Sequence, residues 1–148
     1  MPEALHSAIG APRDVAAIDI ILYAVGHRYY AVFKDEQYPT FDHPQGKSIR
    51  IASGSSLTGP FGKPGPSASP SFREAPSVVP RPDGKGWYLY FEQYPGEGYE
   101  VATAASLDGP WFNIYIKETA IASDTRHGFV MPLNQEHWNA IVAAYGEK

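Results

Sequence analysis

The amino-acid sequence predicts an all-β fold, and three observations lead to this prediction. The composition is rich in turn formers and rings, with 14 Gly, 14 Pro, 10 Tyr, 7 Phe and 3 Trp among 148 residues, which suits many short strands better than a helical bundle. Apolar segments of strand length alternate with turns that contain glycine. This pattern occurs twice along a chain whose length is that of one domain.

The first set of strands is predicted between residues 18 and 56. The segments 18–25 and 27–36 are rich in β-branched and aromatic residues and meet at Gly26, which is typical of a hairpin turn. A polar connection that contains Pro39 and Pro44 follows them. After this connection, the segment 47–56 is predicted as the third strand.

The second set repeats the pattern. Its strands are predicted at 77–82, 85–94 and 98–106. Asp83-Gly84 separates the first two segments, and Asp-Gly between apolar runs is a strong hairpin signal. Pro95-Gly96 marks the turn between the last two segments.

The two sets contain copies of one internal repeat. Segments 49–61 and 99–111 are identical at an offset of 50 at Ala52/Ala102, Ser56/Ser106, Leu57/Leu107, Gly59/Gly109 and Pro60/Pro110. Repeats of about 40–50 residues built from three or four strands are typical of propeller blades, which must stack to bury their faces. Repeats at approximately 18–61 and 74–112 are too few to close a ring. The sequence therefore predicts a partial β-propeller of two to three blades.

The C-terminal part, 126–148, is predicted to contain a final strand and a short helix. Asn134 is a suitable N-cap residue for this helix. Four apolar side chains follow it at helical spacing, namely Trp138, Ile141, Val142 and Tyr145. This spacing predicts that the helix packs against the core.

Composition and charge exclude several classes of function. The formal net charge is −4 and no run of like charges is present, so nucleic acid is not expected as a partner. The absence of cysteine excludes disulfides, zinc-thiolate sites and thiol nucleophiles. No export signal or membrane span is recognised. The chain as written is expected to be cytoplasmic, or secreted if a signal has been removed from it.

Two carboxylates at strand openings are the first candidates for chemistry. Asp19 lies inside an apolar run, where a carboxylate must face a polar cavity or find donors. The Pro-, Gly- and Ser-rich loop 59–76 brings Glu74 to the equivalent place in the second repeat. Two such groups in one pocket would shift each other's pKa, as acid catalysis of glycosidic cleavage requires. The alternative is that each is a strand-end cap or a member of an ion pair.

Four further residues are candidates for contacts with a substrate or an ion. Arg126 and His127 open the last predicted strand, and an arginine there could bind an anion or a sugar hydroxyl. Histidine in such a position is more often a structural turn residue. Asp35 ends a strand and could contact a substrate or simply face solvent. Tyr94 could stack on a sugar ring or fill the space between blades.

The chain resembles the C-terminal part of a family 43 glycoside hydrolase, of the arabinofuranosidase and β-xylosidase kind. The resembling segments are, in order, AIDIILYAVGHRYYAVFKDE (17–36), KSIRIASGSSLTGPF (47–61), REAPSVVPRPDGKGWYLYFEQY (73–94), GYEVATAASLDGPW (98–111) and TRHGFVMPL (125–133). Each is unspecific alone, but the ordered set is fairly specific. Together they extend from residue 17 to residue 133.

The resemblance implies a five-bladed propeller that hydrolyses arabinose- or xylose-containing glycosides with inversion. It implies that Glu74 is the general acid and that Asp19 tunes the acid's pKa and orients substrate. His127 would match a central histidine that holds a water or a calcium ion, and Arg126 would contact the sugar. Asp35 and Tyr94 complete the expected substrate contacts.

Three features depart from the family pattern. The base aspartate of the family lies in a blade that precedes the matching segment, whereas inversion requires a base about 6.5–9.5 Å from the acid. Ala75 replaces the glycine that usually follows the acid. Ile20 and Ile21 replace smaller residues or proline after the aspartate.

Two alternatives to hydrolysis therefore stay open. The chain could be a catalytically inert carbohydrate-binding module that keeps the cleft without the base. It could also be a self-assembling unit, because exposed blade faces are apolar and a second copy would cover them. A homo-oligomer is expected in either case.

Overall fold

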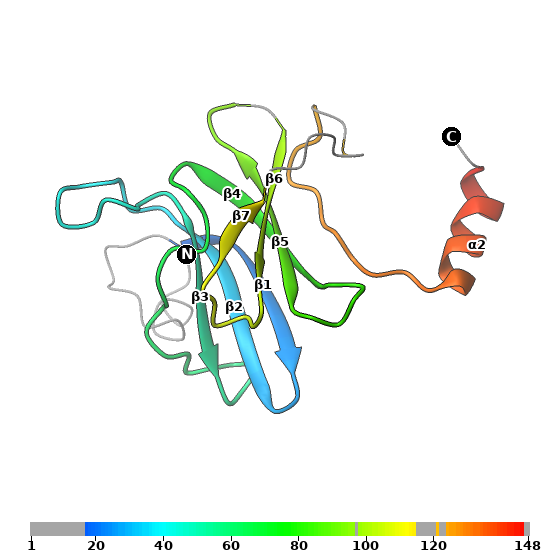
Figure 1. Ribbon diagram of the computed structural model, residues 1–148, viewed down its shortest axis with the longest axis horizontal. Helices are drawn as coiled ribbons and strands as arrows, with labels where there is room; N and C mark the ends of the chain where they lie inside the picture. Colours follow the sequence, from blue (N-terminus) through cyan, green and yellow to red (C-terminus); the bar gives the residue numbers. More distant parts are fainter. Residues whose placement is uncertain (1–16, 97, 115–120, 122–123, 147–148) are drawn as a thin grey trace.

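The computed structural model describes residues 17–96, 98–114, 121 and 124–146. Within them lie two antiparallel sheets and one α-helix (Figure 1). The first sheet contains β1 (Ala17–Val25), β2 (Arg28–Asp35) and β3 (Ile49–Gly54) in that order. The second contains β4 (Arg73–Pro80), β5 (Trp87–Gln93), β6 (Tyr99–Ala104) and β7 (Phe112–Ile114). The helix is α2 (Gln135–Tyr145).

The all-β prediction is confirmed, and each sheet corresponds to one of the two repeats. Both sheets are simple meanders, in which each strand pairs with the next one along the chain. This is the arrangement expected of a partial propeller, and the described strands form no closed barrel or ring.

The hairpins form where the glycines predict them. In the first sheet Val25 pairs with Arg28, so the turn consists of Gly26 and His27 alone. Gly26 has φ 59°, which lies in the left-handed region that favours glycine. In the second sheet Asp83 stabilises the turn by accepting from Arg81 at 2.6 Å and from the Lys85 N–H at 3.0 Å.

The internal repeat is a repeat of structure as well as of sequence. After β3 the Gly59 N–H donates to the Ser56 carbonyl at 3.1 Å, and after β6 the Gly109 N–H donates to the Ser106 carbonyl at 3.0 Å. The two glycines have φ 78° and 83°. The chain then takes different courses. In the second repeat it forms β7, a short strand paired with β6 that the sequence did not predict.

In the first repeat the predicted connecting loop runs alongside β3 instead. The N–H groups of Gly62, Gly65 and Ala68 donate to carbonyls of β3 at 2.8 to 2.9 Å. The Ser69 hydroxyl accepts from the Ile49 N–H at 2.9 Å. The loop therefore covers the free edge of the first sheet, which would otherwise expose unpaired backbone groups.

The strand that carries Glu74 begins earlier than predicted. β4 starts at Arg73, whose guanidinium donates to Glu100 of β6 at 2.7 and 3.0 Å. The Arg73 N–H also bonds the carbonyl of Lys47, next to the first sheet. These contacts place Glu74 inside the sheet, paired with Glu92 of β5, rather than in a loop.

The core lies between the two sheets. Its buried members are Tyr30, Val32, Ile49, Ile51, Ala68, Val78, Leu89, Phe91, Ala102 and Leu107. Tyr23 of β1 and Trp87 of β5 meet edge to face across it, with ring centroids 5.1 Å apart. A smaller cluster around Phe33 and Phe61 lies on the opposite face of the first sheet.

The predicted final strand at 126–133 is not formed. Residues 124–134 have no regular secondary structure. Backbone N–H groups of this segment bond to side chains of the second sheet instead of to a neighbouring strand. His127 donates to Glu92, Gly128 to the Tyr99 hydroxyl and Val130 to the Ser77 hydroxyl. The segment is thus held against the sheet without forming part of it.

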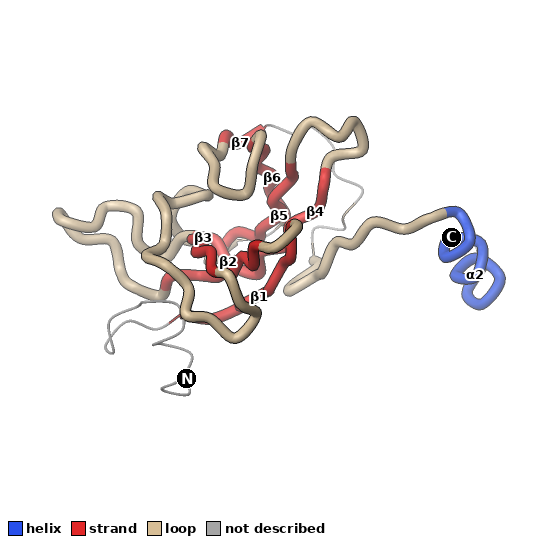
Figure 2. The backbone as a smooth tube through the Cα atoms, turned by 90° about the horizontal axis from the view of Figure 1, so that it is seen from below, coloured by secondary structure: helices blue, strands red, loops and turns tan. Residues whose placement is uncertain are grey.

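The helix forms where predicted, but its expected packing on the core is wrong. Asn134 caps α2 by accepting from the His137 N–H at 2.8 Å. No residue of α2 is buried, and Trp138, Ile141 and Tyr145 are 48%, 41% and 81% exposed. Figures 1 and 2 show α2 standing clear of both sheets, because the chain leaves the second sheet after Val130.

No helix among the described residues is long and apolar enough to cross a membrane.

Truncation of the core predicts a large loss of stability. Leu89→Ala should lower the free energy of unfolding by about 2–5 kcal/mol, because Leu89 is fully buried and its removal leaves a cavity. Denaturant titration measures the loss. Leu22→Ala is the matched control, since Leu22 is 46% exposed on β1 and should change stability by no more than about 0.5 kcal/mol. Equal losses would contradict the placement of the core between the sheets.

Candidate functional site

Glu74 is held between two cations that come from different parts of the chain. Lys34 of β2 donates to Oε2 of Glu74 at 2.6 Å, and Arg126 donates to Oε1 at 2.9 Å. The Glu74 and Lys34 side chains are only 8% and 3% exposed. A buried carboxylate needs such partners, because an unpaired one would cost several kcal/mol.

Glu92 is a second buried carboxylate beside Glu74. The two glutamates pair across β4 and β5. Glu92 accepts from the Arg126 guanidinium at 2.9 Å and from the His127 N–H at 2.9 Å. Glu74 and Glu92 therefore share the Arg126 guanidinium. We call Asp19, Lys34, Glu74, Glu92, Arg126 and His127 the Glu74 cluster.

Matching irregularities in β1 and β4 bring Asp19 to this cluster. The strand register shifts between Ile18 and Ile21 and again between Glu74 and Ser77. Asp19 and Ala75 occupy these bulges with φ 52° and 48°, conformations that residues other than glycine seldom adopt.

The expected equivalence of Asp19 and Glu74 is therefore off by one residue. Ile18 pairs with Lys34 as Glu74 pairs with Glu92, so Asp19 corresponds to Ala75. Asp19 is bound to the backbone of the residue after Glu74, because its Oδ2 accepts from the Ala75 N–H at 3.0 Å.

His127 completes the group that faces Asp19 and Glu74. Its Nε2 lies 3.5 Å from Oε1 of Glu74 and 3.5 Å from Oε1 of Glu92. One polar atom from each of Asp19, Glu74 and His127 lies within 4.8 Å of the others. The sequence singled out these three residues, and the structure brings them together.

The ion pairs keep Glu74 in its charged form. Burial alone would raise the pKa of the Glu74 carboxyl, but the hydrogen bond and charge of Lys34, together with the other polar neighbours, outweigh it, and the pKa is lowered from the ordinary 4.5. The pKa of Lys34 is raised from the ordinary 10.5, because its hydrogen bonds to Glu36 and Glu74 outweigh its own burial. Both groups are ionised at neutral pH.

The donor set fits a calcium ion poorly. Calcium prefers about six to eight oxygen ligands, whereas Asp19, Glu74 and His127 offer two carboxylates and one ring nitrogen. Both oxygens of Glu74 already accept from cationic donors, Lys34 and Arg126. These positive charges would repel a divalent ion at the same place.

Of the other two predicted contacts, Tyr94 lies beside the cluster and Asp35 does not. Lys34 Nζ lies 4.7 Å from the centroid of the Tyr94 ring, which is partly exposed. Asp35 is buried and accepts from His43 at 3.1 Å and from Arg50 at 3.3 Å. The reason is strand alternation, because Asp35 follows Lys34 and points to the opposite face of the first sheet.

Sequence reasoning missed Lys34 and Glu92. When the two repeats are aligned at the Gly26 and Gly84 turns, these residues follow Phe33 and Phe91 at matching positions. A charged residue at one position of both apolar strands was the available signal, because a charge there needs a buried partner.

Comparison with known proteins identifies the family. A family model described as a probable glycosyl hydrolase domain, related to family 43, matches residues 6–139. The chain belongs to this glycosyl hydrolase family. The match confirms the resemblance to family 43 drawn from the sequence, and it covers both sheets, the Glu74 cluster and the start of α2. No curated protein gives a match.

Removal of Lys34 should show how far the stability of this glycosyl hydrolase domain depends on the buried ion pair between Lys34 and Glu74. Lys34→Met keeps the side-chain length but leaves Glu74 without its closest cation, so the free energy of unfolding at neutral pH should fall by about 3 kcal/mol. The loss should shrink at acid pH: the lowered pKa of Glu74 gives stability above about pH 4.5 that disappears as the pH falls through the folded value.

Two controls separate this effect from a general loss of packing. In a Glu74→Gln background the Lys34→Met change should cost much less, which a double-mutant cycle measures. Arg81→Met removes the exposed ion pair to Asp83 and should leave the unfolding midpoint almost unchanged. A Lys34→Met loss that is the same at neutral and acid pH would contradict the pairing.

Proposed function

We propose that the Glu74 cluster binds a carbohydrate, with an arabinose or xylose unit as the ligand. The observation that carries this proposal is the pairing of Glu74 with Lys34 and Arg126. These bonds make Glu74 a fixed carboxylate that positions exposed donors. They do not suit a proton donor, which must carry its proton at the working pH.

The groups that would touch the sugar are the exposed members of the cluster. The Arg126 and His127 side chains are about half exposed, and the buried carboxylates hold them in place. Asp19 adds an acceptor at the same place. Sugar hydroxyls both donate and accept hydrogen bonds, so a fixed set of donors and acceptors matches them.

The Tyr94 ring gives the cluster an apolar surface. It is partly exposed and lies beside Lys34. Sugar rings present C–H groups on one face, and an aromatic ring packs well against such a surface. Fixed polar groups next to an open ring are a combination suited to a pentose.

Hydrolysis of arabinose- or xylose-containing glycosides is the second candidate, and membership of the glycosyl hydrolase family favours it. In that case Glu74 would donate the proton to the leaving oxygen, as an inverting acid, and Asp19 would tune its pKa. The unliganded site is unsuited to this role, because the Glu74 carboxylate is charged and has no proton to donate. A substrate would have to displace Arg126, whose side chain is 44% exposed, and a base would have to come from outside the cluster.

The binding proposal predicts a measurable affinity without turnover. Calorimetric titration with D-xylose and L-arabinose should show heat of binding at neutral pH. Tyr94→Ala should weaken binding about tenfold through loss of the ring contact. Tyr38→Ala is the matched control, because Lys47 lies over the Tyr38 ring in the same way, at 4.5 Å, outside the cluster. Equal effects of both variants, or no binding by the wild type, would overturn the proposal.

The hydrolysis candidate is tested with aryl arabinofuranosides and xylosides. If the chain is active, the rate should rise as the pH falls, because the pKa of Glu74 is lowered and only its protonated form can act as the acid. Lys34→Met should then extend activity to higher pH, and Glu74→Gln should abolish it. Sugar binding with no release of the aryl group over a day would eliminate hydrolysis by this chain.

A further inference from the structure

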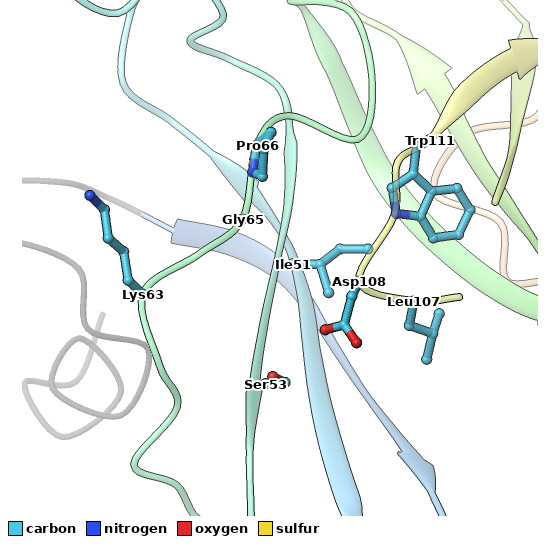
Figure 3. A pocket seen from close by; sticks show the side chains of 8 residues that line it. All are labelled: Ile51, Ser53, Lys63, Gly65, Pro66, Leu107, Asp108 and Trp111. Carbon is cyan, nitrogen blue, oxygen red and sulfur yellow. The ribbon is translucent and has the colours of Figure 1, made fainter. Parts of the chain in front are cut away.

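A pocket lies between the two repeats, at the turn that follows β6 (Figure 3). Its volume is about 130 Å³, and its lining comes from Ile51, Ser53, Lys63, Gly65, Pro66, Leu107, Asp108 and Trp111. Ile51, Leu107 and Pro66 give it an apolar wall. The Lys63 side chain extends away from the other lining residues.

Trp111 brings a buried donor to this pocket. Its indole Nε1–H is buried and finds no acceptor within the part of the chain that the structure describes. Figure 3 shows the nitrogen edge of the ring on the side of Ile51 and Asp108. Buried donors are nearly always paired in folded proteins, so one without a partner requires an explanation.

The internal repeat shows that packing alone does not require this donor. Trp111 corresponds to Phe61 at the offset of 50 residues, and Phe61 is buried after the matching turn of the first repeat. A phenyl ring therefore closes that turn well. The indole of the second repeat adds an N–H group that the fold leaves unused.

The polar wall of the pocket is fixed by Arg28. This side chain donates to Asp108 at 3.0 and 3.3 Å and to the Ser53 hydroxyl at 2.7 Å. Tyr30 also donates to Asp108, at 3.3 Å. The carboxylate is thus neutralised and held in place, and it still has lone pairs for further donors. Ser53 accepts from Arg28 and keeps its own proton to donate.

We propose that this pocket is a second carbohydrate site that takes a single sugar ring. Its volume is close to that of a protein cavity of about 150 Å³ that admits benzene, so one six-membered ring is the size that fits. An apolar ring would leave the Trp111 N–H unpaired, and an anion would find the Arg28 guanidinium already paired with Asp108. A sugar ring offers an acceptor to Trp111, hydroxyl protons to Asp108 and C–H groups to Ile51 and Leu107.

The pocket is separate from the Glu74 cluster and does not depend on the function proposed there. Arg28 begins β2 and Lys34 lies near its other end. The six residue steps of extended strand from Arg28 to Lys34 separate them by about 20 Å. A ligand at one place therefore leaves the other free.

The experiment follows the three indole N–H signals of the full chain by nitrogen-15 NMR during titration with D-xylose. Trp111→Phe assigns the Trp111 signal and leaves those of Trp87 and Trp138. D-xylose should shift the Trp111 signal in a saturable way, and benzoate, an anionic ring of similar size, should not. Calorimetry on the Glu74→Gln protein reports this site if the cluster no longer binds.

Trp111→Phe is the decisive variant, because Phe61 shows that a phenyl ring closes the same turn. In the Glu74→Gln background it should weaken D-xylose binding about three- to tenfold, the effect of one lost hydrogen bond. No shift of the Trp111 signal up to high D-xylose concentration would show that only water fills the pocket, and would overturn the proposal. So would a larger shift with benzoate, or unchanged affinity in Trp111→Phe.

Discussion

The buried ion pair between Lys34 and Glu74 joins the two sheets of this protein and determines how the rest of the site is arranged. The residues are 40 positions apart in the chain and come from β2 and β4. Each also has a second partner, since Lys34 bonds Glu36 and Glu74 bonds Arg126. An unpaired charge in this place would be costly, so the sheets cannot slide or separate there. Arg126 in turn fixes the irregular segment that carries His127.

The same bonds that hold the structure together also set its chemistry. A glycosidase acid must keep a proton at the working pH, which usually results from burial or from a neighbouring carboxylate. Here burial acts on Glu74 in that direction, but the hydrogen bond and charge of Lys34, together with the contacts to Glu92 and His127, outweigh burial and lower its pKa. Membership of a glycosyl hydrolase family thus coexists with a centre whose glutamate is held in its charged form.

The sequence was informative where the physics is local. The first three strands, the hairpin at Gly26 and the Asn134 cap depend on neighbours within a few residues, and these predictions are confirmed. The repeat also found the correct pairs of turns. The bulge at Asp19 could not be predicted, because it is defined by the partner strand and shifts the equivalence of the repeats by one residue.

Long-range partners account for the other differences. Glu74 lies within β4 rather than before it because Arg73 bonds Glu100 on a strand further along the chain. Asp35 is turned away from Glu74 by strand alternation and is bound by His43 and Arg50. Lys34 could not be predicted as a site residue, because its contact with Glu74 depends on the packing of β2 beside β4. The spacing of apolar residues in α2 predicted that one helix face packs on the core. Spacing alone does not determine whether another part of the chain lies against that face.

The exposed position of α2 gives the protein a second, independent folding equilibrium. Its 11 residues are closed by Asn134 at one end and by the bond from the Gly146 N–H to the Val142 carbonyl at the other. A helix of fewer than about 12–15 residues is marginal in water without tertiary contacts, and none of its residues is buried. On warming, helical circular dichroism should therefore fade gradually before the sheets melt together, so a single transition temperature would describe only the β part of the chain.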